Sequence, residues 1–379
     1  MKNPLHDDGG APPRLTDNLA VPHGVLPPEA TQRAPLVADG RNIAPSLGLL
    51  RGEAAQQKNL KARSQRISMA ELGSSTSDGK SYYGLPLLQP VIWKHSIPFY
   101  FYIGGLSGAS CALGAAAQLG GPGLHRLVKR ARLIGTVGAA ISAGLLIEDL
   151  GRPERFFNMM RVFRPSSPMN MGTWILTAFG GAVGAAALFG QRPGAVGKLG
   201  EAAGVAAGVL GLPLAGYTAV LIANTAVPVW QLARASLPPL FLGSAASSAA
   251  SFFELLPLTR REEKVVKRFG AAGKIAELVA TLAIDRDVGR VPRAALPLRS
   301  GFSGALWHAA KVATAASLAL TVWPGRSTKR RRIAGVLGTL GALATRLSLL
   351  QAGRRSAQDA QASFAQQRAG LGAAQVCGG

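Results

Sequence analysis

Eight long apolar segments constrain the fold of this chain more than any other feature of its sequence. Each comes close to the roughly 20 apolar residues that cross a bilayer as a helix. Inside lipid, the backbone polar groups of such a segment are satisfied only by helical hydrogen bonds. The sequence therefore predicts an all-α integral membrane protein, a polytopic bundle of about eight transmembrane helices. The segments cover residues 98–118, 132–150, 171–190, 204–224, 237–256, 269–284, 303–323 and 333–351.

The composition agrees with this class. Only 16% of the residues are charged, whereas soluble proteins carry about 25%. The net charge of +23 would suggest nucleic acid as the partner of a soluble protein. Here the Lys and Arg residues lie mostly in short loops between apolar segments, as in membrane proteins. We therefore expect a lipid bilayer as the partner, and no nucleic acid.

The apolar segments lie within a transmembrane domain that we place at residues 81–352. Residues 1–80 are rich in Pro, Gly and Ala and have no sustained apolar period, which predicts a disordered extension. They also lack the apolar stretch of a signal peptide. Residues 353–379 are predicted to form a flexible C-terminal tail.

Loop charges suggest an orientation. Eight spans place both ends of the domain on one face, here called side A, at which the first span begins. The opposite face, side B, has more Lys and Arg in its loops, most densely in residues 326–332. Positive loops favour the cytoplasm, so we expect a multi-pass protein of the cell (inner or plasma) membrane with side B in the cytoplasm.

Metal and haem sites of the chain's own are not expected. The two cysteines, Cys111 and Cys377, form no CxxC motif, so an iron–sulfur cluster or a Cys-rich zinc site is excluded. A haem between helices needs two histidines at one depth on facing spans. His95 and His308 share side A but lie at helix ends, and His125 is on side B.

Aromatic and acid–base residues gather at side A. A quinone ring stacks on aromatic surface, and its two carbonyls need donors that also exchange protons, as His, Tyr and carboxylates do. The imidazole of His95 titrates near neutral pH. Each residue also has a plainer interpretation as an interfacial anchor or a structural ion pair. We predict a quinone site from Trp93, His95, Tyr100, Asp149, Arg152, Tyr217 and Asn224.

Ionisable residues inside the spans suggest a proton path. Charged groups in a bilayer are costly and usually line a route for protons or ions. Glu254, Lys274 and Glu277 lie in the fifth and sixth spans, and Glu148 lies at the side A end of the second. Lys274 and Glu277 are three residues apart, so a structural pair on one helix face is the alternative.

Two stretches resemble the signatures of the NrfD/polysulfide reductase membrane-subunit family. The first is WKHSIPFYFYIGGLSG, from Trp93, and the second is EDLGRPERFFNMMRVFRPSSPMNMGTW, from Glu148. The resemblance extends over about residues 82–350. Tyr217 and Asn224 lie outside both signatures, and His95 is not fixed by the first. The matching positions are Trp93, Pro98, Tyr100, Gly105, Asp149, Arg152, Pro153, Arg155, Ser167, Pro168 and Met169.

The resemblance implies an eight-helix, haem-free subunit of a larger oxidoreductase. Such a subunit exchanges electrons between the membrane quinone pool, menaquinone or ubiquinone, and a ferredoxin-like subunit with four [4Fe–4S] clusters. That partner serves a molybdopterin subunit, which would hold the catalytic centre. Two alternatives remain open from the sequence: a proton- or ion-translocating membrane protein, and a non-redox membrane anchor.

Overall fold

The computed structural model describes residues 43–44, 49–50, 88, 93, 96–121 and 123–371. The chain divides into two units, Met1–Tyr82 and Tyr83–Gly379. In the first unit, the described residues form two short antiparallel strands, β1 (Ile43–Ala44) and β2 (Leu49–Leu50), with Ile43 opposite Leu50. The rest of the predicted N-terminal extension, His95 and residues 372–379 lie outside the described residues.

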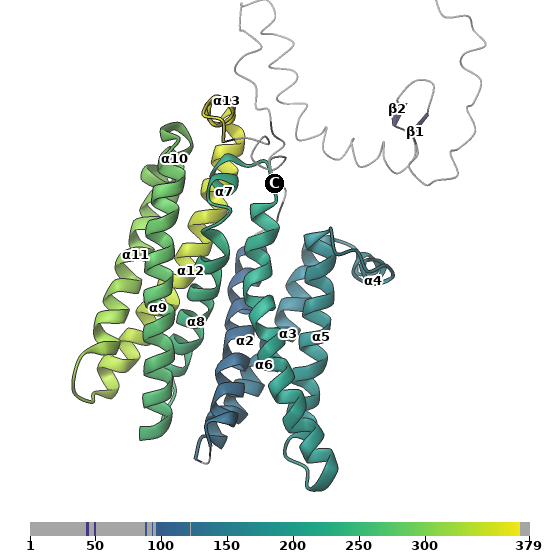
Figure 1. Ribbon diagram of the computed structural model, residues 1–379, viewed down its shortest axis with the longest axis vertical. Helices are drawn as coiled ribbons and strands as arrows, with labels where there is room; N and C mark the ends of the chain where they lie inside the picture. Colours follow the sequence, from purple (N-terminus) through teal and green to yellow (C-terminus); the bar gives the residue numbers. More distant parts are fainter. Residues whose placement is uncertain are drawn as a thin grey trace, which may run out of the picture. The chain divides into compact units, whose positions relative to one another are not determined.

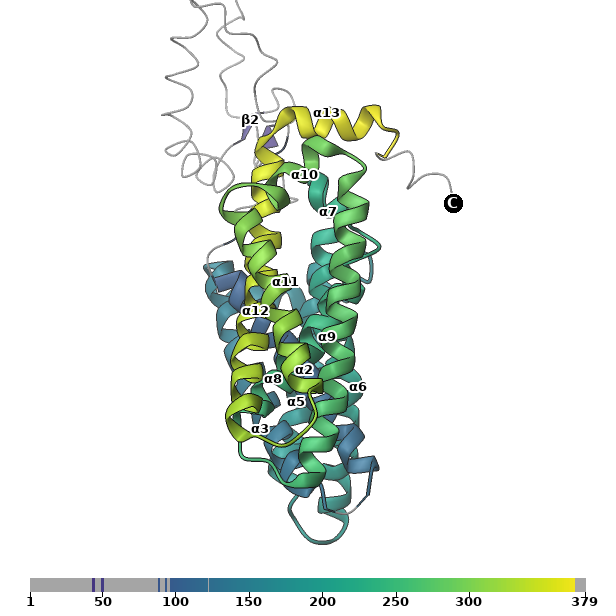
Figure 2. The same ribbon diagram turned by 90° about the vertical axis from the view of Figure 1, so that its left-hand side faces the viewer.

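The described part of the second unit contains eight long helices, and they run side by side in both views (Figures 1 and 2). Each corresponds to one of the eight apolar segments. Four short helices, α4 (Glu154–Met160), α7 (Pro228–Leu232), α10 (Pro292–Arg299) and α13 (Ala360–Arg368), occupy connections at side A and the C-terminal end. The long helices are α2 (Ser96–Leu119), α3 (His125–Leu150), α5 (Pro168–Phe189), α6 (Gly194–Ala223), α8 (Leu237–Leu255), α9 (Arg260–Gly289), α11 (Gly301–Val322) and α12 (Thr328–Gln358).

Six of these helices are long and apolar enough to cross a membrane: α2, α3, α5, α6, α11 and α12. The helices α8 and α9 are long but less apolar. Helix α8 is rich in serine and carries Glu254, and α9 carries many charged residues. Both nevertheless lie alongside the other long helices (Figure 1). The helical membrane class is therefore confirmed, and a total of eight spans stays a prediction.

The long helices form two groups of four. One group contains α2, α3, α5 and α6, the other contains α8, α9, α11 and α12, and α2 packs on α8 and α12 where the groups meet. Small residues set the closest approaches. A Cβ atom on Gly108 of α2 would lie 2.2 Å from the carbonyl oxygen of Gly211 on α6, so these two backbones touch as small residues allow in lipid.

Several helices extend beyond the apolar segments that predicted them. For example, α9 begins at Arg260, nine residues before the predicted start at 269, because Thr259 and Glu262 form a reciprocal capping box there. Part of the predicted C-terminal tail is helical. Helix α12 continues to Gln358, and Asp359 caps α13 while pairing with Arg293 at 2.7 Å.

Candidate functional site

Besides Glu262, which is buried at the capping box that begins α9, four ionisable side chains lie buried further inside the group formed by α8, α9, α11 and α12. They are Glu254 on α8, Lys274 and Glu277 on α9, and Arg346 on α12, and each is at most 3% exposed. Two are acids and two are bases, so their formal charges balance. Such groups are rare inside membranes and usually belong to ion or proton routes.

Lys274 is paired with Glu254, not with Glu277. Its Nζ lies 3.0 Å from both Glu254 carboxylate oxygens and 2.8 Å from the hydroxyl of Thr321 on α11. The alternative considered from the sequence, an ion pair along α9, is not what forms: Lys274 pairs across helices, where glycine lets α8 approach α9. A Cβ atom on Gly270 would lie 2.7 Å from Ala250 Cβ, which leaves no room for a larger residue.

Glu277 lies one turn further along α9 from Lys274, toward side A. The Thr345 hydroxyl on α12 is 3.3 Å from its Oε1, and Ser244 and Ser247 of α8 lie beside the carboxylate. Lys274 is also within electrostatic range of Glu277. The Thr345 hydroxyl therefore contacts one carboxylate oxygen, while the other, Oε2, is buried without a hydrogen-bond partner among the described residues.

Arg346 is the fourth of these buried side chains, and it lies where the two helix groups meet. Its Nε donates to the Phe101 carbonyl at 2.9 Å, and one terminal nitrogen donates to the Ser244 hydroxyl at 3.1 Å. The guanidinium also lies over the Phe241 ring, 4.7 Å from its centroid. Because Ser244 contacts Arg346 and lies beside Glu277, one hydroxyl links the base to the acid. We call Glu254, Lys274, Glu277 and Arg346 the buried charge series.

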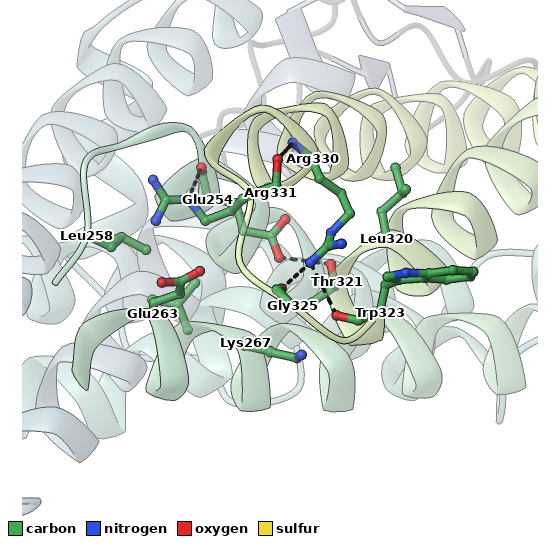
Figure 3. Close-up of a pocket in the computed structure, with 12 residues that line it drawn as sticks. Glu254, Leu258, Glu263, Lys267, Leu320, Thr321, Trp323, Gly325, Arg330 and Arg331 are labelled. Atoms are coloured by element: carbon green, nitrogen blue, oxygen red, sulfur yellow. Dashed lines mark hydrogen bonds between the residues drawn. The ribbon is translucent and has the colours of Figure 1, made fainter. Parts of the chain in front are cut away.

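A small cavity connects the buried charge series to side B (Figure 3). Glu254 and Thr321 form its inner wall, and Glu263, Arg330 and Arg331 lie around it. Its volume of about 40 Å³ gives room for roughly three water molecules, since each needs about 10–15 Å³ by the same measure. The cavity therefore has room for water beside the Glu254 side chain.

At side A, Trp93 and Tyr100 belong to one apolar core. The Trp93 ring stacks on Trp230 of α7 with centroids 5.7 Å apart and meets the edge of Phe101. Tyr100 is 2% exposed, and its hydroxyl has no hydrogen-bond partner among the described residues. One face of Trp93 is thus taken by protein, and the Tyr100 hydroxyl is buried without a partner among the described residues.

The second signature stretch forms the loop between α3 and α5. Gly151 ends α3 with φ +74°, a conformation that favours glycine. Arg155 donates to the Leu150 carbonyl at 3.0 Å, and Ser167 caps α5, accepting from Asn170. These residues build the loop that carries Arg152 at the surface and leaves Asp149 half-buried at the end of α3. Asp149 and Arg152 each take part in a further interaction.

Tyr217 and Asn224 are two turns apart on α6, at its side A end. The Tyr217 ring lies against Gly172 of α5, where a Cβ atom would come within 2.1 Å of it. Asn224 follows the last residue of α6 and lines a surface cavity together with Gln231 and Arg234. Tyr217 therefore contacts the neighbouring helix α5, whereas Asn224 lines a surface cavity. Glu148 is exposed at the end of α3, apart from the buried charge series.

Metal ligands do not cluster in the described part of the chain, where no group of three or more His, Cys, Asp and Glu side chains could hold an ion. His308 is exposed on α11. The sequence reasoning missed Arg346, Thr321, Thr345 and Trp230. Arg346 could have been found, because it is a charged residue within the segment 333–351; the others carry no such signal.

Residues 86–356 match the protein family described as "Polysulphide reductase, NrfD". The matched region begins before α2 and ends near the end of α12, so it contains all eight long helices. No curated protein matches the chain.

Proposed function

Because the chain belongs to the polysulphide reductase NrfD family, we propose that it is the quinone-handling membrane subunit of a multi-subunit oxidoreductase. The family consists of membrane subunits of polysulfide reductase-type oxidoreductases. In this proposal the chain exchanges electrons between the quinone pool, menaquinone or ubiquinone, and a four-cluster [4Fe–4S] subunit docked on side A. A molybdopterin subunit completes the complex and holds the catalytic centre.

The proposed quinone site is the side A end of the first helix group. Trp93, His95 and Tyr100 lie at the start of the first span, Asp149 and Arg152 at the end of the second, and Tyr217 and Asn224 at the end of α6. The Tyr100 hydroxyl supports this site, since it has no hydrogen-bond partner among the described residues and would be a donor for a quinone carbonyl. A bound quinone would accept two electrons and two protons to become a quinol.

The main observation in support of this proposal is the buried charge series. A redox subunit that reduces or oxidises quinone must move protons, and ionisable residues kept inside a membrane bundle suit that task. Glu254 meets the side B cavity, Lys274 and Glu277 continue inward, and Arg346 lies where the helix groups meet. We propose that protons pass along Glu254, Lys274 and Glu277, and that Glu148 exchanges them with water at side A.

Isolation of the tagged chain from its native membrane, with its associated subunits, tests this function. The expected complex contains iron–sulfur and molybdenum-containing subunits and turns over a soluble quinone analogue. An intact complex without quinone-dependent turnover would point to a membrane anchor. Proton movement in liposomes without quinone turnover would point to a translocating protein instead.

A further inference from the structure

A second cavity lies at side B, in the first helix group, and we call it the Arg132 cavity. Its walls come from α2, α3, α6 and the connection between α5 and α6. Its volume is about 570 Å³, within the range of roughly 300–1,000 Å³ that small-molecule sites occupy. The cavity is therefore large enough for a lipid head group. The polar side chains that line it are Gln118, His125, Lys129, Arg132, Gln191 and Glu201.

The inner wall of the Arg132 cavity is an ion pair held in place by protein contacts. The two terminal nitrogens of Arg132 donate to the two carboxylate oxygens of Glu201 at 2.9 and 2.7 Å, and one also donates to the Gln118 side chain at 3.0 Å. Glycines make room for the guanidinium, since a Cβ atom on Gly190 or Gly204 would lie 2.2 or 2.7 Å from it. Among the described residues that line the cavity, Glu201 is the only acid, and Arg132 balances its charge.

The outer part of the Arg132 cavity is basic. His125 and Lys129 are exposed and lie one turn apart on the same face of α3. Arg261 of α9 approaches from the other helix group, and its guanidinium lies 3.0 Å from the position that a Cβ atom on Gly123 would take; it also takes part in a further interaction. Since the one acid is already balanced, an anion with several oxygen atoms would be attracted to this rim.

Apolar side chains next to the cavity are exposed to lipid. Leu119, Leu188 and Leu199 lie at the side B ends of α2, α5 and α6, each within two residues of a residue that lines the cavity, and they are 75%, 69% and 67% exposed. All three helices are long and apolar enough to cross a membrane. Basic cavities between such helices suit the head groups of anionic lipids, and the leucines offer a surface for the acyl chains.

We propose that the Arg132 cavity binds the phosphate head group of an anionic phospholipid. Lys129 provides the positive charge and the His125 imidazole a hydrogen-bond donor, while the acyl chains lie on the exposed leucines. Inorganic phosphate would make only the polar contacts, and a zwitterionic lipid would bring its own cation close to Lys129. The cavity is separate from the quinone site and the proton path, so the inference does not depend on the proposed function.

Lipid binding by the full chain tests this site. The chain is purified in detergent, freed of lipid and titrated with dioleoylphosphatidylglycerol or dioleoylphosphatidylcholine, and native mass spectrometry measures the bound lipid. We expect phosphatidylglycerol to bind at least ten-fold more tightly than phosphatidylcholine. Lys129→Gln should weaken phosphatidylglycerol binding about ten-fold or more, the effect of one lost hydrogen bond to a charged group. Lys129→Arg keeps the charge and should bind nearly as the wild type does.

Lys329→Gln is the matched control, because Lys329 is an exposed lysine at side B of the other helix group. It should leave lipid binding unchanged. Equal binding of the two lipids by the wild type, or equal effects of Lys129→Gln and Lys329→Gln, would overturn the site in favour of general attraction to the basic surface. Displacement of phosphatidylglycerol by an equal concentration of inorganic phosphate would make the cavity a site for free anions instead of lipid.

Discussion

The Nζ of Lys274 lies 3.0 Å from both carboxylate oxygens of Glu254, and these side chains are 0% and 4% exposed. They join α9 to α8, and the Thr321 hydroxyl of α11 contacts both. Burying two charges is costly, and their attraction offsets that cost only while both are present. The two residues should therefore behave as one unit in stability and in proton transfer.

Removal of one partner should destabilise the protein more than removal of both. Lys274→Met leaves the Glu254 carboxylate buried without its cation, which typically costs about 3–5 kcal/mol. The double variant Glu254→Gln, Lys274→Met should recover most of that loss. Unfolding in detergent, followed by circular dichroism for the wild type, Glu254→Gln, Lys274→Met and the double variant, measures the coupling.

A second ion pair gives the matched control. Arg326 and Glu263 pair at side B with 52% and 24% exposure, so Glu263→Gln should cost about 1 kcal/mol or less. Strictly additive losses for the Glu254 and Lys274 variants would show that the buried pair is not coupled.

Much of the fold could be predicted from the sequence because apolar length alone identifies membrane helices. The membrane class is confirmed, and so is the family, which was predicted from the stretches beginning at Trp93 and Glu148. Helix ends were less accurate. The start of α9 at Arg260 and the continuation of α12 to Gln358 depend on capping and ion pairs, which the apolar pattern does not contain.

The candidate site could be predicted only in part. Glu254, Lys274 and Glu277 stand out in the sequence because each interrupts an apolar segment. The spacing of Lys274 and Glu277 indicates neighbours on one helix, but the true partner of Lys274 is on α8. Contacts between helices depend on close approaches such as that at Gly270, and a single sequence does not give them.

Gly151 should be required for the turn that follows α3. Its φ of +74° is unfavourable for a residue with a Cβ atom, by roughly 1–2 kcal/mol. Gly151→Ala should therefore lower the unfolding free energy by about that amount. Gly144→Ala, in the same helix and facing open space, should cost nothing. Equal effects of the two changes in detergent unfolding would contradict the role of the turn.

Asp149→Asn should impair quinone turnover while the complex still assembles. The change keeps the size of the side chain but removes its charge, at the half-buried end of α3 beside the loop that carries Arg152. We expect a loss of about ten-fold or more, as for other acid–base groups. The measurement is turnover of a quinone analogue by the purified complex. Turnover near that of the wild type would make Asp149 a structural residue.

Side B should face the cytoplasm. Residues 326–332, between α11 and the first turn of α12, form the densest basic segment among the loops, and positive loops stay in the cytoplasm. Fluorescent protein and alkaline phosphatase fusions after Gly325 test this. Fluorescence without phosphatase activity is expected, and the reverse result would place the side A partner in the cytoplasm.

Glu277→Gln should slow proton-coupled quinone turnover without unfolding the bundle. Glutamine keeps the shape of the side chain and can still contact the Thr345 hydroxyl, 3.3 Å away in the wild type, but it cannot carry a proton. Loss of an acid–base group usually slows the proton-transfer step by about 10²–10⁴-fold. Overall turnover falls by less than this where that step is only partly rate-limiting. We expect at least a ten-fold loss of turnover, measured with a quinone analogue from pH 5 to 9. Glu201→Gln is the control, because Glu201 is a glutamate of the other helix group, where it pairs with Arg132 at 2.7 Å. It should lower stability and leave the pH profile unchanged. If Glu277→Gln instead lowers the unfolding temperature with no change in turnover, the buried charge series is a structural network and protons take another route.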